Sequence, residues 1–167
     1  GMKRIVAAFQ RGLWSRDEAA NRRYLEWKYE LNPFAAGSRI YLAYCGEELV
    51  AMRGFYGSLW ESGDLPDRFP ILVADDLLID EAFRSTGLFN YLMQYALDDL
   101  AHGGHVHILN LGANQLNVAG SLSTGWRIAC SLRPLSRASF ARTLHKVVRR
   151  SVARLPVFWR WSDSRRL

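Results

Sequence analysis

Apolar runs of strand length recur along residues 39–132, separated by short segments rich in Gly, Asn, Asp and Pro. Such runs, bounded by turn-forming residues, are typical of β-strands. The third run, ILVADDLLID, is apolar at nearly every position except Asp75 and Asp76. We expect strands at residues 39–44, 49–60, 71–80, 105–113 and 126–132.

Other segments carry apolar residues at helical spacing. Ser15-Arg-Asp-Glu18 matches a capping box and predicts a helix through about Glu30, which Asn32-Pro33 would end. A second helix is expected from about Leu88 to His102, where Gly103-Gly104 would end it. A short helix is expected at 114–124, and an amphipathic helix at 139–155.

The order of these elements indicates the fold class. A helix and an antiparallel hairpin, with its turn at 45–48, come first, and a strand–helix–strand unit follows. This order predicts an α/β or α+β domain with a mixed sheet. Gly54 and Gly57 lie inside the long second strand and predict a bulge or a close backbone approach.

Length and composition place the chain among ordinary single-domain globular proteins. It has 167 residues, of which 49% are hydrophobic and 23% are charged. Gly1 before Met2 is typical of a tag-cleavage remnant, and no segment has the ~20 apolar residues of a membrane-spanning helix. Cys45 and Cys130 lie far apart and are expected to be reduced core thiols of a cytoplasmic protein.

Charged residues are distributed unevenly along the chain. Residues 133–167 contain ten basic residues and one acid, Asp163, for a net charge of +9, whereas residues 1–132 have a net charge of −3. We therefore expect one domain at 1–136 and a basic helix and tail at 137–167. The tail could bind an anionic membrane surface, pack on the acidic body, or contact a second subunit in a homodimer. Nucleic acid is not expected, because no recognition motif for it is present.

The segment FRSTGLF, residues 83–89, connects the third strand to a helix. Such a junction offers free backbone N–H groups and the positive end of a helix dipole, which suit an anion. Neither the P-loop pattern nor the dinucleotide fingerprint is present. The other interpretation is an ordinary turn between a strand and a helix.

Four segments together resemble the GNAT acyltransferases, the N-acetyltransferases that use acyl-CoA. IDEAFRSTGLF resembles their V-x-P-x-x-R-G-x-G-[LI] loop, and Asn114 with Gly125-Trp126 resembles their N-x(10)-G-[FW] segment. GEELVAMRGF resembles their hairpin, and WKYELNPF resembles a bacterial branch. The resemblance covers roughly residues 15–135. It implies a mixed, mostly antiparallel sheet flanked by helices, with a splayed central strand pair.

The resemblance also implies roles for particular residues. Acetyl-CoA would be the co-substrate and a small-molecule or sugar amine the acceptor, with no metal. Backbone groups of Leu77, Leu78 and Ile79 would pair with the pantetheine arm. The coenzyme A pyrophosphate and its surroundings would be bound by Arg84, Ser85, Thr86, Gly87, Leu88, Phe89 and Asn114.

A base is needed because only a neutral amine can attack the acyl carbon. We expect Asp76 to be this base, with Asp75 second, because the sequence offers these two acids inside an apolar strand. Adjacent residues of a strand point to opposite faces, so one of them should face the cleft. Alternatively, one of them caps a neighbouring loop.

Two positions depart from the pattern of the family. Ser121 stands where some members of the family carry a tyrosine that protonates the leaving thiolate. Ser85 stands where the loop usually has glycine, and serine is tolerable there if its φ stays negative. An acyl-CoA-binding module with little or no activity is therefore the alternative function.

Arg53 either meets an acidic acceptor or is solvated surface.

Overall fold

The computed structural model describes residues 1–63, 67–105, 107–112 and 115–130. Gly1–Arg127 forms one compact unit, and the chain from Ile128 onward belongs to a second. The basic helix expected at 139–155 and Asn114 lie outside the described residues. The elements are α1 (Met2–Phe9), η1 (Gln10–Gly12), α2 (Glu18–Glu26), η2 (Trp27–Leu31), β1 (Arg39–Cys45), β2 (Glu48–Ser62), β3 (Asp67–Ile79), η3 (Glu81–Phe83), α3 (Leu88–His102), β4 (Ile108–Asn110) and α4 (Gln115–Ser123).

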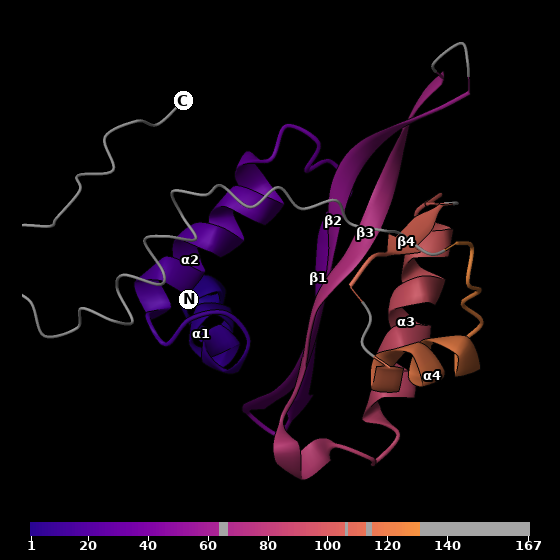
Figure 1. Cartoon of the computed structure of the whole chain (residues 1–167). Helices are drawn as coiled ribbons and strands as arrows, with labels where there is room; N and C mark the ends of the chain where they lie inside the picture. The colour runs from indigo at the N-terminus through magenta and orange to yellow at the C-terminus, as the bar shows by residue number, and fades with distance from the viewer. Residues whose placement is uncertain (64–66, 106, 113–114, 131–167) are drawn as a thin grey trace, which may run out of the picture. The chain divides into compact units, whose positions relative to one another are not determined.

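The described strands form one mixed sheet in the order β1-β2-β3-β4 (Figure 1). β1 pairs with β2 and β2 with β3 in antiparallel fashion, whereas β3 and β4 run parallel. This confirms the predicted mixed, mostly antiparallel sheet flanked by helices.

Helices cover both faces of this sheet, α1 and α2 on one side and α3 with α4 on the other (Figure 1). The α3 side buries Phe55, Leu72 and Met93 in one core cluster. Met52 packs with Val6 and Leu25 in a second cluster on the α1–α2 side. Ala51 and Met52, which are neighbours in β2, thus pack into opposite cores, as the alternation of a strand requires.

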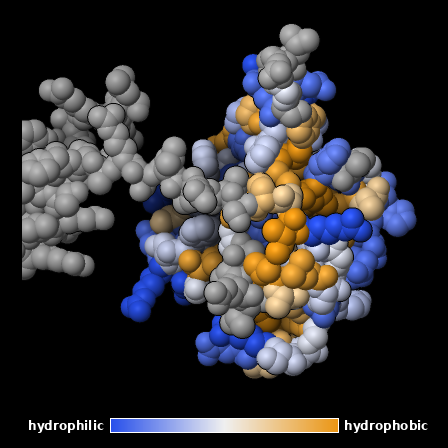
Figure 2. Space-filling model, turned by 45° about the vertical axis from the view of Figure 1, so that its right-hand side comes forward, coloured by the Kyte–Doolittle hydropathy of each residue, from blue (hydrophilic) through white to orange (hydrophobic). Residues whose placement is uncertain are grey.

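The outer surface of the unit is mixed in character. Figure 2 shows apolar side chains grouped among hydrophilic ones on the face that it presents. Exposed large apolar residues of the described chain include Leu111, beyond β4, and Leu122 in α4. In the described part of the chain, no helix meets the length and hydropathy needed to cross a bilayer.

Several local predictions were wrong. Helix α1 was not predicted, although it buries Val6 and Ala7. Asp17, rather than Ser15, caps α2 and accepts hydrogen bonds from the backbone N–H groups of Ala19 and Ala20. Residues 126–130 of the strand expected at 126–132 have no regular structure. Both cysteines are exposed, since Cys45 lies at the hairpin turn and Cys130 lies in this irregular segment.

Candidate functional site

A bulge in β3 determines the geometry of the site. Met52 pairs with Leu78 and Gly54 with Asp75, so Asp76 and Leu77 together oppose the single residue Arg53. The extra residue is accommodated because Asp76 adopts a left-handed backbone with φ of 53°. Asp75 and Asp76 therefore both contact Lys28, and the prediction that they point to opposite faces was wrong.

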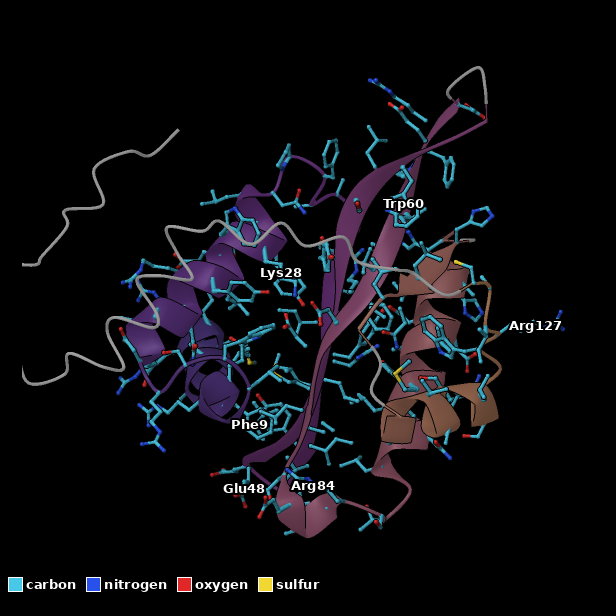
Figure 3. All side chains as sticks on the ribbon, in the orientation of Figure 1. Phe9, Lys28, Glu48, Trp60, Arg84 and Arg127 are labelled. Carbon is cyan, nitrogen blue, oxygen red and sulfur yellow. The ribbon has the colours of Figure 1, made fainter. Side chains whose placement is uncertain are left out.

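Lys28 is the cation between these two acids. It extends from η2 toward the sheet (Figure 3), and its side chain is only 4% exposed. Its Nζ donates to Asp75 Oδ2 at 2.7 Å and to Asp76 Oδ2 at 3.0 Å. A third bond goes to the Tyr24 hydroxyl at 3.1 Å. All three ammonium protons thus have an acceptor, as a buried ammonium requires.

Asp76 is enclosed by donors. Trp14 Nε1 donates to its Oδ1 at 2.8 Å, and the Tyr29 hydroxyl donates to its Oδ2 at 2.6 Å. With Lys28 as the third donor, the Asp76 side chain is 0% exposed. Asp75, by contrast, is 40% exposed and has Lys28 as its ion-pair partner. We call Trp14, Lys28, Tyr29, Asp75 and Asp76 the acid–lysine cluster.

Aromatic rings surround the lysine charge. Nζ of Lys28 lies 4.7 Å from the ring centroid of Tyr56 and 5.2 Å from that of Tyr24. The rings of Trp14 and Tyr29 are each 5.7 Å away. These distances permit cation–π attraction to all four rings.

The electrostatics of the cluster keep its protons in place. Burial lowers the pKa of Lys28, but the hydrogen bond to Asp75 and the charges of both acids outweigh it, so the net pKa is raised. Burial, and next the negative charge of Asp76, raise the pKa of Tyr29 far above its ordinary value. Lys28 is therefore a cation and Tyr29 a neutral donor at physiological pH.

Two glycines of β2 allow the segment Trp27–Phe34 to approach the sheet. A Cβ at Gly54 would collide with the Tyr29 hydroxyl, and one at Gly57 with the carbonyl oxygen of Phe34. Asn32 Nδ2 fixes the segment further by donating to the Gly57 carbonyl at 2.8 Å. The predicted close backbone approach is thus confirmed at Gly57, whereas Gly54 faces a side chain and lies at the bulge between β2 and β3.

β3 and β4 separate beside the bulge. They pair at Leu72–Ile108, Val73–Leu109 and Ala74–Asn110, and in the described chain the pairing goes no further. β3 continues to Ile79 with β2 on one side alone. The predicted splay is therefore present, and it opens one edge of β3 along Leu77, Leu78 and Ile79. We call the point after Ala74 the fork.

The loop after β3 leads into α3 without a side-chain cap. Gly87, at φ of 86°, is the N-cap residue of α3, and no acid lies in the first turn of this helix. Ser85 has φ of 62°, so the condition under which serine is tolerable at this position is not met. Left-handed residues at alternate positions are typical of backbone concavities that bind anions.

The side chains of this loop differ in their surroundings. Arg84 is exposed and pairs with Glu81 at 3.2 Å, and the Thr86 hydroxyl donates to the Phe83 carbonyl at 2.7 Å. Phe89 is half-buried against the α3-side core and lies against Gly120 of α4. A hollow of about 400 Å³ adjoins the loop. Its walls are Tyr44, Cys45, Val50, Phe83, Thr86, Gly87, Leu88 and Tyr91.

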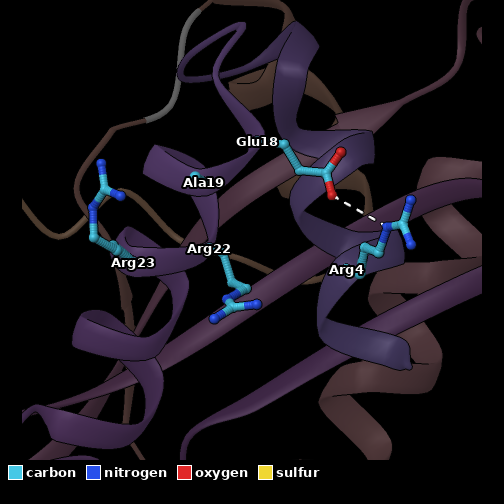
Figure 4. Close-up of a pocket in the computed structure, with 5 residues that line it drawn as sticks. All are labelled: Arg4, Glu18, Ala19, Arg22 and Arg23. Carbon is cyan, nitrogen blue, oxygen red and sulfur yellow. Dashed lines mark ion pairs between the residues drawn. The ribbon is translucent and has the colours of Figure 1, made fainter.

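A larger hollow of about 580 Å³ lies between α1 and α2 (Figure 4). Arg4 and Glu18 form an ion pair of 3.5 Å across it, and the Arg4 side chain is largely exposed. Exposed ion pairs of this kind contribute little to the free energy of folding, and they do not indicate a ligand. Despite its size, this hollow is a weaker candidate than the fork and loop.

Sequence reasoning missed Lys28 and Tyr29 as site residues. Both lie in the segment WKYELNPF, and their spacing from Asp76 along the chain, 48 and 47 residues, hides the contact. Ser121 is buried, and its carbonyl accepts from the Trp126 backbone N–H at 3.2 Å. The described residues contain no group of His, Cys, Asp and Glu side chains that could hold a metal ion.

Comparison with known proteins gives a fold. No protein-family model matches the sequence, and no curated protein matches it. Among solved structures, the aminoglycoside 6'-N-acetyltransferase AAC(6')-Ih from Acinetobacter baumannii is 16% identical, with a TM-score of 0.59, over 81% of this chain and 90% of that chain. AAC(6')-Iy with a bisubstrate analogue of coenzyme A is 10% identical, with a TM-score of 0.60, over 82% and 92%.

A third solved structure, a predicted acetyltransferase from Clostridium acetobutylicum with acetyl-CoA, is also similar. It is 10% identical, with a TM-score of 0.58, over 81% of this chain and 86% of that chain. The chain thus has the fold of the GNAT acetyltransferases.

Proposed function

We propose that this protein is an N-acetyltransferase that transfers an acetyl group from acetyl-CoA directly to the amine of a small molecule. The observation that carries the proposal is the fork, where the open edge of β3 leads into a loop and a helix without a side-chain cap. An edge of this kind can pair with an extended amide-containing arm, and the helix start can bind a phosphate.

The residues around the fork fit coenzyme A. A Cβ added at Gly87 would meet no heavy atom within 4 Å, so a phosphate has room there. Arg84, Ser85, Thr86 and the backbone N–H groups of Leu88 and Phe89 would bind the pyrophosphate. Backbone groups of Leu77, Leu78 and Ile79 would pair with the pantetheine arm. Asn114 would be a further contact to coenzyme A. Acetyl-CoA supplies an acyl thioester that an amine can attack.

The acid–lysine cluster would receive the acceptor amine. We assign Asp75 as the base, because its side chain is 40% exposed, whereas Asp76 has three donors and no exposure. Asp76 would then hold Lys28 and Tyr29 in place. The sequence alone favoured Asp76, because it gives no information on how the two carboxylates differ in burial.

The test is release of free thiol from acetyl-CoA in the presence of a panel of amines, including polyamines and amino sugars. We expect one or more amines to stimulate release, and Asp75→Asn to lower the rate about a hundredfold. Asp67→Asn, at an exposed position of the same strand, is the matched control and should leave the rate unchanged. Coenzyme A binding without release for any amine would indicate a binding module, and full activity of Asp75→Asn would exclude Asp75 as the base.

A further inference from the structure

Arg53 is a buried cation, and none of the residues that the structure describes is its hydrogen-bond or ion-pair partner. It is 5% exposed, and within the described residues no ion pair or hydrogen bond of its guanidinium is found. Its Nε is fully buried with no acceptor. A guanidinium stays charged, and leaving its buried Nε–H donor without an acceptor is costly. Such a group is expected to have an acceptor, and the described part of the chain does not supply one.

The position of Arg53 indicates where this acceptor lies. Ala51 and Phe55 belong to the α3-side core, so Arg53, between them in β2, points to the same face. Its Cζ lies 5.7 Å from the ring centroid of Phe55, which is paired with Ala74. Ala74 is the last residue of β3 that pairs with β4. The guanidinium therefore lies beside the fork.

The charges near Arg53 do not satisfy its donors. Burial lowers the pKa of Arg53, while Asp75, Tyr29 and Asp76 oppose this effect through space. Both acids bind Lys28 on the opposite face of the sheet, and two carboxylates with one ammonium leave one negative charge. This charge attracts Arg53 across the sheet but offers it no hydrogen bond. Charge compensation alone is thus the competing explanation.

We propose that Arg53 binds a negatively charged group at the reacting end of a coenzyme A ligand, as a second anion site separate from the loop at Arg84. The proposal rests on the proposed function, which places that end of the ligand at the fork. Two sources share this chemistry: the thiolate of coenzyme A itself, and a terminal carboxylate on a longer acyl group. The planar guanidinium can bind a thiolate or a carboxylate, because hydrogen bonds between charged groups are stronger than those between neutral groups.

The experiment is calorimetric titration of four ligands into the wild type, Arg53→Gln and Arg53→Lys. Butyryl-CoA and succinyl-CoA compare a neutral acyl end with a carboxylate end. Coenzyme A at pH 7 and pH 9 compares thiol with thiolate, since a thiol has a pKa of about 8.5, and acetyl-CoA at both pH values controls for the protein's own titration.

We expect the wild type to bind one anionic end about tenfold more tightly than its neutral counterpart. Arg53→Gln should lose this preference, and Arg53→Lys should keep part of it. A gain for succinyl-CoA identifies the carboxylate, and a gain for coenzyme A at pH 9 identifies the thiolate.

Two outcomes would overturn the proposal while leaving the proposed function intact. One is equal binding of neutral and anionic ends by the wild type, and the other is a preference that survives in Arg53→Gln. Either would leave charge compensation as the role of Arg53. If the wild type bound none of the four ligands, the proposed function itself would fail. If neither variant folds, equal binding of neutral and anionic ends by the wild type still overturns the proposal.

Discussion

Buried charged side chains on the two faces of the sheet differ in whether they have partners. On the α1–α2 side, Lys28 and Asp76 form a buried ion pair. Trp14 and Tyr29 donate further hydrogen bonds to Asp76. On the α3 side, Arg53 is equally buried but has no acceptor in the described chain. The first arrangement is what stability requires of buried charges, and the second indicates a ligand. Substitutions on the two faces should therefore affect different properties.

The largest effect is expected from Lys28→Met, which leaves Asp76 buried without its cation. Breaking a buried ion pair on one side costs about 3–5 kcal/mol of unfolding free energy. Lys3→Met is the matched control, because the Lys3–Glu30 pair has a similar length of 2.7 Å but is exposed. The control should cost less than about 1 kcal/mol in urea unfolding. Equal losses in the two variants would show that the cluster is not a stabilising unit.

Asp76→Asn and Asp75→Asn should separate stability from activity. Asparagine tolerates the left-handed backbone of position 76, so Asp76→Asn removes the charge without disturbing the bulge. We expect it to lower the unfolding free energy by about 1.5–3 kcal/mol, because three donors lose an ionised acceptor. Asp75→Asn should cost under about 1 kcal/mol because its ion pair is partly solvated. The reverse order in urea unfolding would contradict the burial argument.

Alkaline pH should weaken the cluster as a whole. The folded-state pKa values of Lys28 and Tyr29 are raised above their ordinary values of 10.5 and 10.0. The folded protein therefore keeps protons that the unfolded chain loses, so stability is full below about pH 10 and declines as the pH rises further. Urea midpoints between pH 8 and pH 11 measure this decline, and Tyr29→Phe should make it shallower. A midpoint that stays constant up to pH 11 is incompatible with the raised values.

The smallest effect is expected in the loop. Ser85 has a left-handed backbone that costs an L-residue about 1–2 kcal/mol, whereas glycine adopts it freely but loses more entropy on folding. Ser85→Gly should therefore raise the unfolding free energy by about 0.5 kcal/mol. A melting midpoint that falls would mean that the serine side chain makes a compensating contact in the folded protein.

Some elements of this structure could be predicted from the sequence because they depend on local sequence patterns. The apolar run before FRSTGLF and the helical spacing after it indicated β3 and α3, and Gly54 and Gly57 indicated a close backbone approach. Helix α1 was missed because its apolar stretch, IVAAF, is short. It is held by packing of Val6 with Leu25 and Met52, a contact between distant parts of the chain.

The site was less predictable because it depends on register. The left-handed backbone of Asp76 becomes apparent only when β2 and β3 are paired, and it turns both acids toward Lys28. Arg53 was compatible with a solvated surface on sequence grounds, and that alternative was wrong because Arg53 lies on the covered α3 side of the sheet and is 5% exposed. Sequence patterns indicate which faces are apolar, but they do not show which charged side chains lack partners.

The most direct test of the account is thermal melting of the wild type and Arg84→Glu with coenzyme A and acetyl-CoA, against ADP as a control. A ligand that binds only the folded state raises the midpoint, by about 5–10 °C at a hundredfold excess over Kd. We predict such a rise for both coenzyme A ligands, a smaller one for ADP, and a reduced one in Arg84→Glu. No shift of the wild type at millimolar ligand would mean that the loop is an ordinary turn and that the fork holds no coenzyme A.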